Sequence, residues 1–372
     1  MNAFSCVPLR EIVRVHYGKA LKAADRDVIG PHNVYGSSGC VGKHRTRLVE
    51  YPTLIVGRKG SVGQVTYAPD GGWPIDTTFF VEILDEHQVY LRFLFYALRR
   101  ARLDRHTITT TIPGLNRDDI YKTKILLPPL AEQCRIAAIL DKADAIRRKR
   151  RESIKLLDEF LRSAFLEMFG DPVRNPRGWE VRCLRDVVKE DQPITYGIVQ
   201  AGPHVNGGVP YIKSGDLRYG EISMQQLSRT SHEIARRYER SMVHAGDIVF
   251  SIRASVGAAA VVPESLDGAN LTQGTARISP GSIVDGEYLL AAIRSQGFQH
   301  WIRQRMKGAT FREITLAALR EAPVMVPPIK SQKQYARIVA GVGSIKSHVT
   351  AATSTTSDLF DSLAQRAFRG EL

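Results

Sequence analysis

The residues best suited to chemistry are cations and hydroxyls that recur in two matching segments, residues 51–63 and residues 245–257. Arginine can hydrogen-bond guanine or a phosphate, lysine can neutralise a phosphate, and neighbouring glycines let the backbone approach a ligand closely. Both segments end in Ser-Val-Gly, which also suits a turn needed only for its shape. We therefore expect the glycines to be structural and leave the cations open between a binding and a structural role. The candidates are Arg58, Lys59 and Ser61 in the first segment and Arg253 and Ser255 in the second.

Other polar side chains lie in segments that differ between the two halves of the chain, as reading two different sequences would require. Hydroxyls, amides and arginine suit base edges, while lysine mainly supplies salt-sensitive affinity. The first half offers Tyr35, Ser37, Ser38, Lys43, His44 and Arg45, and Thr110 and Thr111 shortly before its final strand. The second half offers Lys213, Ser214, Asp216 and Arg218, and Lys307, Thr310 and Arg312 in the corresponding place.

A run of five cations, Arg147 to Arg151, stands in the middle of a long helical pattern. It could contact phosphates of DNA that is not read for sequence. It could equally be a solvated face, or a surface that meets an acidic partner. The sequence leaves these readings open.

Several segments resemble catalytic motifs but lack a residue that the motif requires. Residues 37–43 carry the Gly-Lys of a phosphate loop, but Ser37 replaces the first glycine and His44 replaces the metal-binding Ser or Thr, so we interpret the segment as a turn. His232 to Arg236 lacks the second histidine of a zinc-protease helix and indicates a surface helix. The sequence contains no credible acid–base pair. The pattern favours a reader of nucleic acid over an enzyme, with no cofactor or metal bound by this chain.

These candidates are embedded in a duplication that covers the whole chain of 372 residues. Besides the Ser-Val-Gly segments, residues 126–133 (Leu-Leu-Pro-Pro-Leu-Ala-Glu-Gln) return as residues 325–332 (Met-Val-Pro-Pro-Ile-Lys-Ser-Gln). A period this long exceeds that of solenoid repeats and indicates two copies of one domain. Two similar domains predict two similar acts of recognition.

The charge of the chain agrees with a polyanionic partner. The formal net charge is +14 and the pI is about 9.7. Such an excess of cations speeds the encounter with nucleic acid, although a protein can also be basic without binding one. Nucleic acid is the partner we expect.

The remaining composition is that of a globular protein, with 43% hydrophobic and 24% charged residues. No apolar stretch approaches the roughly 20 residues of a membrane span, and the first residues lack a basic region followed by an apolar core. We therefore expect a cytoplasmic protein. The four cysteines show no CxxC spacing, which argues against a zinc site and against a disulfide framework.

A long helix is predicted at the end of each copy. Residues 131–168 contain no Gly or Pro, and their apolar residues recur at steps of three and four, which is a coiled-coil seam. The expected seam includes Ile136, Ala143 and Ile146, and its phase slips at Arg150. A second helix with Tyr335, Val342 and Ile345 on the same schedule follows the second copy. Two such helices should pair antiparallel, and the front parts read as mixed α/β domains.

In this order and duplication the motifs resemble the specificity subunit of type I restriction–modification systems. The resemblance rests on the two Pro-Pro junctions, the two Ser-Val-Gly segments, the long helices and the terminal Ala-Phe-Arg-Gly-Glu-Leu372. It implies a mixed α/β (α+β) fold with an internal pseudo-two-fold repeat, in which two target recognition domains are separated by two helices that form an antiparallel coiled coil. The implied ranges are 1–128 and 172–326 for the recognition domains and 129–171 and 327–372 for the helices.

The same resemblance implies double-stranded DNA as the ligand, read as two halves of a bipartite, asymmetric target. It implies two methyltransferase subunits docked on the helices and two motor-nuclease subunits that can join. S-adenosylmethionine, ATP and Mg²⁺ would then belong to those partners. The second junction has Lys330-Ser331 where the first has Ala-Glu, which bears on whether both partners dock equally. A basic nucleic-acid-binding scaffold and a divergent nuclease are the alternatives.

Overall fold

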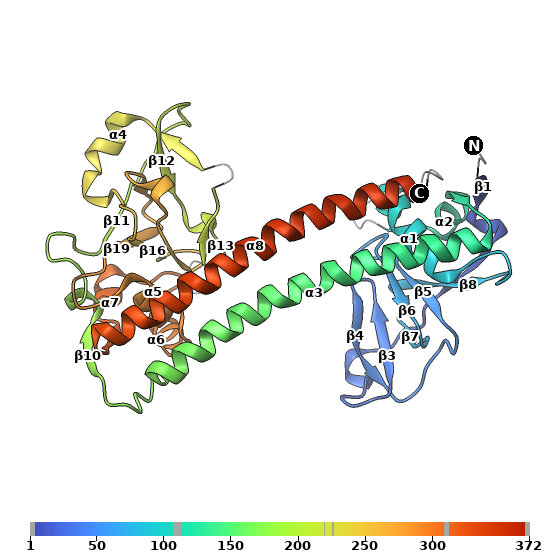
Figure 1. The fold of residues 1–372 in the computed structure, drawn as a ribbon, viewed down its shortest axis with the longest axis horizontal. Coiled ribbons are helices and arrows are strands. Elements are labelled where there is room, and N and C mark those ends of the chain that lie inside the picture. The colour runs from blue at the N-terminus through green and yellow to red at the C-terminus, as the bar shows by residue number, and fades with distance from the viewer. Residues whose placement is uncertain (1–3, 107–113, 219, 225–226, 309–311, 369–372) are drawn as a thin grey trace. The chain divides into compact units, whose positions relative to one another are not determined.

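The computed structural model describes residues 4–106, 114–218, 220–224, 227–308 and 312–368 (Figure 1). The chain divides into two compact units, which are described separately. The first consists of residues 1–151 and 351–372, and the second of residues 152–350. Each unit therefore contains one front part together with one section of each of two long helices.

The first unit is built on three small sheets. A four-stranded antiparallel sheet has the order β2-β8-β5-β6, a three-stranded sheet has the order β4-β3-β7 with β3 and β7 parallel, and β1 pairs with β9. The strands are β1 (Ser5–Pro8), β2 (Val13–Tyr17), β3 (His32–Gly36), β4 (Gly39–His44), β5 (Thr53–Gly57), β6 (Val65–Ala68), β7 (Trp73–Pro74), β8 (Thr78–Ile83) and β9 (Lys124–Leu127). The β-branched and apolar run in β5 is buried over its whole length, which suits a strand inside a sheet.

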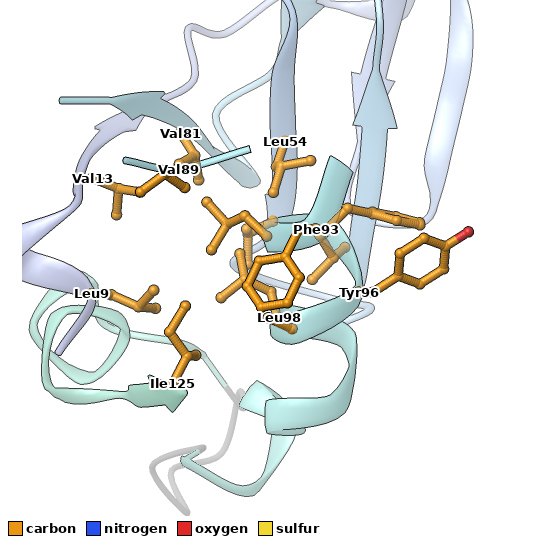
Figure 2. Packing of buried hydrophobic residues seen from close by; sticks show 14 of the residues in the cluster. Leu9, Val13, Leu54, Val81, Val89, Phe93, Tyr96, Leu98 and Ile125 are labelled. Carbon is orange, nitrogen blue, oxygen red and sulfur yellow. The ribbon is translucent and has the colours of Figure 1, made fainter. Parts of the chain in front are cut away.

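Helix α1 (Leu91–Ala101) closes the core of this unit. Phe93, Leu94 and Leu98 are at most 1% exposed. Figure 2 shows Phe93 and Leu98 converging with side chains from β2, β5, β8 and β9. Tyr96 lies at the edge of this cluster with its hydroxyl pointing away from it. Helix α2 (Arg117–Lys122) and the 3₁₀ turns complete the unit. A continuous apolar core of this kind holds the loops at the strand ends in place.

The second unit repeats the topology of the first. Its sheets have the orders β11-β19-β16-β17, β15-β12-β18 and β10-β20, again with one parallel pair, β12 and β18. The strands are β10 (Glu180–Cys183), β11 (Thr195–Tyr196), β12 (Val209–Ile212), β15 (Ser228–Thr230), β16 (Ile248–Ser251), β17 (Ala259–Val261), β18 (Asn270–Leu271), β19 (Thr275–Ile278) and β20 (Pro323–Val326). The predicted duplication is confirmed strand by strand.

The second unit also carries further elements. Strands β13 (Leu217–Arg218) and β14 (Glu221–Ile222) form a hairpin, and helix α4 (His232–Arg237) follows β15. Helices α5 (Gly286–Arg294), α6 (Gln296–Arg305) and α7 (Leu316–Arg320) lie later in the chain. The hairpin and α4 are additions in the front part of the second copy. Helix α4 confirms the surface helix expected from His232 to Arg236, whereas residues 39–44, expected as a turn, form strand β4.

Each Pro-Pro pair is followed by a long helix, α3 (Leu130–Phe169) and α8 (Ile329–Ala367). In the first unit Arg147 stacks on Phe360 at 4.7 Å, and Arg150 reaches back to Thr356. In the second unit the Lys346 Nζ lies 3.4 Å from Asp158, and Phe165 contacts Tyr335 at 5.7 Å between ring centroids. Numbers rise along one helix as they fall along the other, so the helices run antiparallel in both units (Figure 1).

The seam departs from the predicted schedule at an equivalent position in both helices, and at Leu359, which is 54% exposed. Ile146 and Ile345 are 47% and 52% exposed, although the schedule placed them inside. The next residues, Arg147 and Lys346, face the partner helix instead. Arg147 stacks on Phe360 and pairs with Asp144, while Lys346 pairs with Asp158. Within the described residues, neither helix is long and apolar enough to span a membrane.

Candidate nucleic-acid interface

The Ser-Val-Gly segments form the same turn in both units, directly after the equivalent strands β5 and β16. In the first, the N–H of Gly57 donates to the carbonyl of Gln64 at 2.8 Å, and the N–H of Gly63 donates to Gly57 at 2.8 Å. In the second, the N–H of Ser251 donates to the carbonyl of Ala258 at 2.8 Å, and the N–H of Gly257 donates to the carbonyl of Ser251 at 3.0 Å. The repeated sequence therefore encodes one repeated backbone path.

The glycines in this turn are structural, as expected. Gly63 has a φ of 75°, and a Cβ there would lie 2.4 Å from the backbone nitrogen of Asp104. Gly257 has a φ of 94°, and its Cβ would lie 2.3 Å from the side chain of Gln299. Gly60 occupies the left-handed region at 80°, and its equivalent Ala254 does so at 59°. Only glycine adopts this conformation without a steric cost.

The turn presents one cation in each unit at the same position. The N–H groups of Arg58 and Lys59 donate to Thr77, and those of Ile252 and Arg253 donate to Gly274 in the same way. Lys59 is thus equivalent to Arg253, and both are exposed. Arg58 is equivalent to the buried Ile252. Its guanidinium stacks on Tyr17 at 5.1 Å and Phe79 at 5.9 Å, so the geometry gives Arg58 a packing role.

A second loop lies beside this turn in the first unit, between β3 and β4. Gln64 donates from Nε2 to the carbonyl of Ser38 at 3.1 Å, and a Cβ on Gly60 would lie 3.1 Å from Ser37 Oγ. The structure therefore brings Ser37, Ser38, Lys59 and Ser61 together on one face. We call this group the first loop face.

The equivalent loop in the second unit follows β12. Ser214 Oγ donates to the carbonyl of Gly274 at 2.9 Å, which places Ser214 beside the Arg253 turn. Lys213 donates from Nζ to Ser228 Oγ at 2.8 Å, and its N–H donates to Asp216 Oδ2 at 2.8 Å. Asp216 therefore shapes the loop in this structure.

An antiparallel bridge between Lys307 and Glu313 completes the second loop face. The backbones of Lys307 and Glu313 exchange hydrogen bonds of 2.8 and 3.0 Å, and Arg253 Nε donates to Glu313 Oε2 at 3.0 Å. Arg312 is exposed beside this pair. The second loop face thus collects Lys213, Ser214, Arg253, Ser255, Lys307 and Arg312. Sequence reasoning missed Glu313, because nothing in the sequence marks it as the partner of an arginine sixty positions away.

Three first-half candidates lie elsewhere, at the opposite end of β4. His44 is 9% exposed, its Nδ1 lies 3.0 Å from Asp27 Oδ2, and its ring packs edge-on against Trp73 at 5.3 Å. Asp27 also accepts the N–H of Arg45 at 2.6 Å, and Lys43 pairs with Asp27 through the backbone. Residues Lys43, His44 and Arg45 are therefore gathered around an acid that the sequence did not single out.

Tyr35 stands two residues before Ser37 but is buried and does not contribute to the first loop face. It is 4% exposed, packs with Ile55 and Ala68, and accepts a hydrogen bond from Asn33 at 3.2 Å. Burial raises the pKa of its phenol. Thr110, Thr111 and Thr310 lie outside the described residues, and Arg218 is placed only as the end of strand β13.

The run of cations on α3 divides into two sets. Arg147 pairs with Asp144 at 2.5 Å with a side chain only 14% exposed, and Arg150 donates to the carbonyl of Ala352 and to Thr356. These two arginines belong to the contact between the helices. Arg148 and Arg151 are exposed.

Comparison with known proteins identifies the class. The family model described as the type I restriction modification DNA specificity domain matches residues 3–156 and again residues 176–352, so the chain belongs to this family. It is a type I restriction–modification specificity subunit with two recognition domains, the non-catalytic DNA-recognition component of such a complex.

The relatives agree with this assignment. The chain is 27% identical over 353 residues to the type I restriction enzyme EcoBI specificity subunit of Escherichia coli, covering 87% of this chain and 74% of that protein. It is 23% identical over 278 residues to the MjaVIII specificity subunit of Methanocaldococcus jannaschii, covering 68% of this chain and 63% of the relative.

Solved structures share the fold. The S subunit of a type I restriction–modification system from M. genitalium aligns with a TM-score of 0.64 and 17% identity, covering 99% of this chain and 96% of that one. A structure concerned with complex assembly and conformational transition of the type I system aligns with a TM-score of 0.55 and 18% identity, covering 100% and 99%.

Proposed function

We propose that each loop face reads one half of a bipartite, asymmetric DNA target. The observation that carries this proposal is one backbone frame that occurs twice with different side chains. Lys59 and Arg253 occupy the same position after the same strand, as do Ser37 and Ser214 after β3 and β12. A shared frame supports the same docking mode, while different side chains support different half-sites.

The residues proposed to contact DNA are those that the structure gathers at these faces. Arg253, Arg312 and the serines suit base edges, whereas Lys59, Lys213 and Lys307 suit phosphates. Arg58 and Tyr35 are engaged in packing and His44 lies against Asp27, which supports a positioning role for them. Thr110, Thr111, Thr310 and Arg218 remain candidates on the sequence alone.

The proposed partners are two methyltransferase subunits bound along α3 and α8, with two motor-nuclease subunits joining them. Large apolar side chains that point outward from α3 support this docking: in the second unit Leu156 is 55%, Phe160 53% and Leu166 51% exposed. Adenine methylation, ATP hydrolysis and cleavage would belong to these partners. The domain ranges that we propose are 1–128 and 172–326 for recognition and 129–171 and 327–372 for the helices.

We further propose that the protein acts in the cytoplasm. The cysteines are unpaired, and Cys6, Cys40 and Cys134 are exposed, which suits a reducing compartment.

Mapping methylated adenines tests the proposal. The chain is expressed with its methyltransferase in a host without endogenous adenine methylation, and modified sites are sequenced genome-wide. The expected result is one motif made of two short specified parts with an unspecified spacer. Methylation at a single contiguous motif, or methylation that does not depend on this chain, would contradict the proposed function.

A further inference from the structure

An open groove of about 870 Å³ lies in the first unit, and its lining includes Ser61 of the first loop face. It is bounded by β6, by α1, by the loop Ser61–Gln64 and by two residues of α3, Asp144 and Arg148. All of these elements belong to the same compact unit. The groove is therefore a feature of one half of the protein.

Arginines dominate the charge of this groove. Its lining includes Arg92, Arg99, Arg102 and Arg148 against Asp104 and Asp144, four positive charges and two negative ones. The side chains of Arg102 and Arg148 are 58% and 69% exposed, so both reach solvent in spite of their acidic neighbours. Exposed guanidinium groups on an open surface suit the recognition of phosphate.

Arg92 has a different task from the exposed arginines. Its Nε donates to Asp141 at 2.6 Å, and Tyr96 donates to the same carboxylate at 2.6 Å. Its guanidinium also lies 4.7 Å from the ring centres of Tyr67 and Phe95. Arg92 thereby ties α1 to α3 and fixes the two walls of the groove relative to each other.

The backbone at Arg102 is a second, independent observation. This residue ends α1 in the left-handed conformation, with φ 50° and ψ 60°. Glycine is the residue that usually fills this place, because a side chain there clashes with its own backbone. The Arg102 side chain donates from Nε and Nη2 to Asp104 at 3.1 and 3.0 Å and stays 58% exposed, so its remaining guanidinium donors are offered to the groove.

The groove joins two features already described. Ser61 to Gln64, which form part of its lining, belong to the turn that presents Lys59. Arg148, on its other wall, belongs to the run of cations on α3. The exposed cations therefore form a track from the first loop face to α3.

The second unit repeats this charge pattern only in part, because Arg99 corresponds to Arg294 on the count that follows. Tyr90 and Asp285 precede α1 and α5, and their N–H groups donate to Gln133 and Gln332. Arg92 and Glu287 each stand two residues further on, so these two positions correspond. Counting from those glutamines, Gln133 and Gln332, Arg148 corresponds to Ser347. Arg92 and Arg148 are thus cations that the second half replaces, while Arg99 has a counterpart there.

Resting on the proposed function, we propose that this groove binds phosphates of the DNA spacer adjoining the first half-site. Arg99, Arg102 and Arg148 are the phosphate ligands, and Arg92 is a positioning residue. The contact adds affinity without reading sequence. It makes the complex hold the spacer more firmly on the side of the first half-site than on the other.

The test uses the complex of the full chain with its methyltransferase and a duplex that carries the mapped target. Arg102→Gly and Arg148→Ala are compared with Arg14→Ala, a matched control on β2 at the opposite edge of the same sheet. Affinity is measured across a range of salt concentrations. Each groove variant should weaken binding about three- to tenfold and make the log–log salt dependence shallower by about one phosphate contact.

Arg102→Gly separates function from folding, because it relieves the left-handed strain. This variant should unfold at a temperature no lower than the unaltered protein while it binds DNA more weakly. Both groove variants should still methylate the same motif. Binding and salt dependence equal to those of Arg14→Ala would overturn the proposal.

Two further outcomes distinguish the competing explanations. Loss of methyltransferase binding by a groove variant, with an unchanged salt dependence, would overturn the proposal in favour of a surface for an acidic protein. A split motif found with the unaltered chain keeps the proposed function intact in either case, so failure of the groove and failure of the reader are separate results.

Discussion

Gln133 and Gln332 make the same three hydrogen bonds in the two halves of the chain. Gln133 accepts the N–H of Tyr90 at 2.8 Å and donates to the carbonyls of Gln88 and Pro128 at 2.7 and 2.8 Å. Gln332 accepts the N–H of Asp285 at 2.8 Å and donates to Ile283 and Pro327 at 3.1 and 2.7 Å. Both are 0% exposed. Each glutamine joins the start of a long helix to the start of the helix that closes its own domain.

This arrangement explains why the two junctions share Pro-Pro and the final glutamine, whereas the residues between Pro-Pro and the glutamine differ. Ala131 and Glu132 of the first junction, and Lys330 and Ser331 of the second, are outside this bonding pattern. The difference between the junctions therefore leaves the attachment of each helix unchanged.

We expect Gln133→Ala and Gln332→Ala to lower the unfolding free energy by about 2–3 kcal/mol each, because buried backbone groups lose their partners. Denaturant unfolding of the purified complex measures this loss. Gln334→Ala, an exposed position two residues after Gln332, is the control and should change stability by less than about 0.5 kcal/mol. Equal stability of Gln332→Ala and the control would show that these bonds do not support the junction.

Ala254→Gly should stabilise the second unit by about 1 kcal/mol, because Ala254 holds a left-handed φ that glycine adopts freely. The reciprocal change, Gly60→Ala, should destabilise the first unit by a similar amount. Thermal unfolding of the two variants gives the signs. A loss of stability in Ala254→Gly would mean that the two turns are not conformationally equivalent.

Arg253→Ala should weaken binding to the specific target by about 1–3 kcal/mol and relax one base of the half-site read by the second unit. Glu313→Gln should leave the arginine in place without its charged partner and produce a smaller effect at the same half-site. Binding to target duplexes with each base varied in turn measures both changes. Relaxation of the other half-site, or unchanged binding, would contradict the placement of Arg253.

The pH dependence of stability should contain a contribution from Glu287. Burial, and to a smaller degree the charge of Asp285, raise the pKa of this carboxyl, against an opposing effect of Arg294. The folded state therefore binds a proton that the unfolded state has already released, so the unfolding free energy falls as pH rises from the ordinary glutamate value through the raised one. Glu287→Gln should remove this fall and be the more stable form above that window. An identical pH profile in the variant would rule out this contribution.

The sequence predicted the architecture because its strongest local signals agree with the fold. Pro-Pro pairs end β9 and β20 and precede α3 and α8, and the long stretch without Gly or Pro is one helix. The repeated turn was predicted for the same reason, since positive φ at Gly63 and Gly257 leaves little choice of residue. What depends on local backbone chemistry could be read from the chain.

Features that depend on contacts between residues far apart in the sequence could not be predicted from it. Arg147, rather than Ile146, faces α8, because Phe360 and Asp144 accommodate a guanidinium there. His44 lies beside Asp27, and Arg58 stacks on the rings of Tyr17 and Phe79, which are contacts that the sequence does not indicate. The sequence offered residue types, and the packing of separate segments decided which of them face outward.

Exchange of one recognition domain tests the central claim most directly. Residues 1–128 are replaced by those of a related specificity subunit, and methylated adenines are mapped with the same methyltransferase. The account predicts a split motif in which one half changes and the other half is retained. A change in both halves, or the same motif as before, would contradict the assignment of one half-site to each domain.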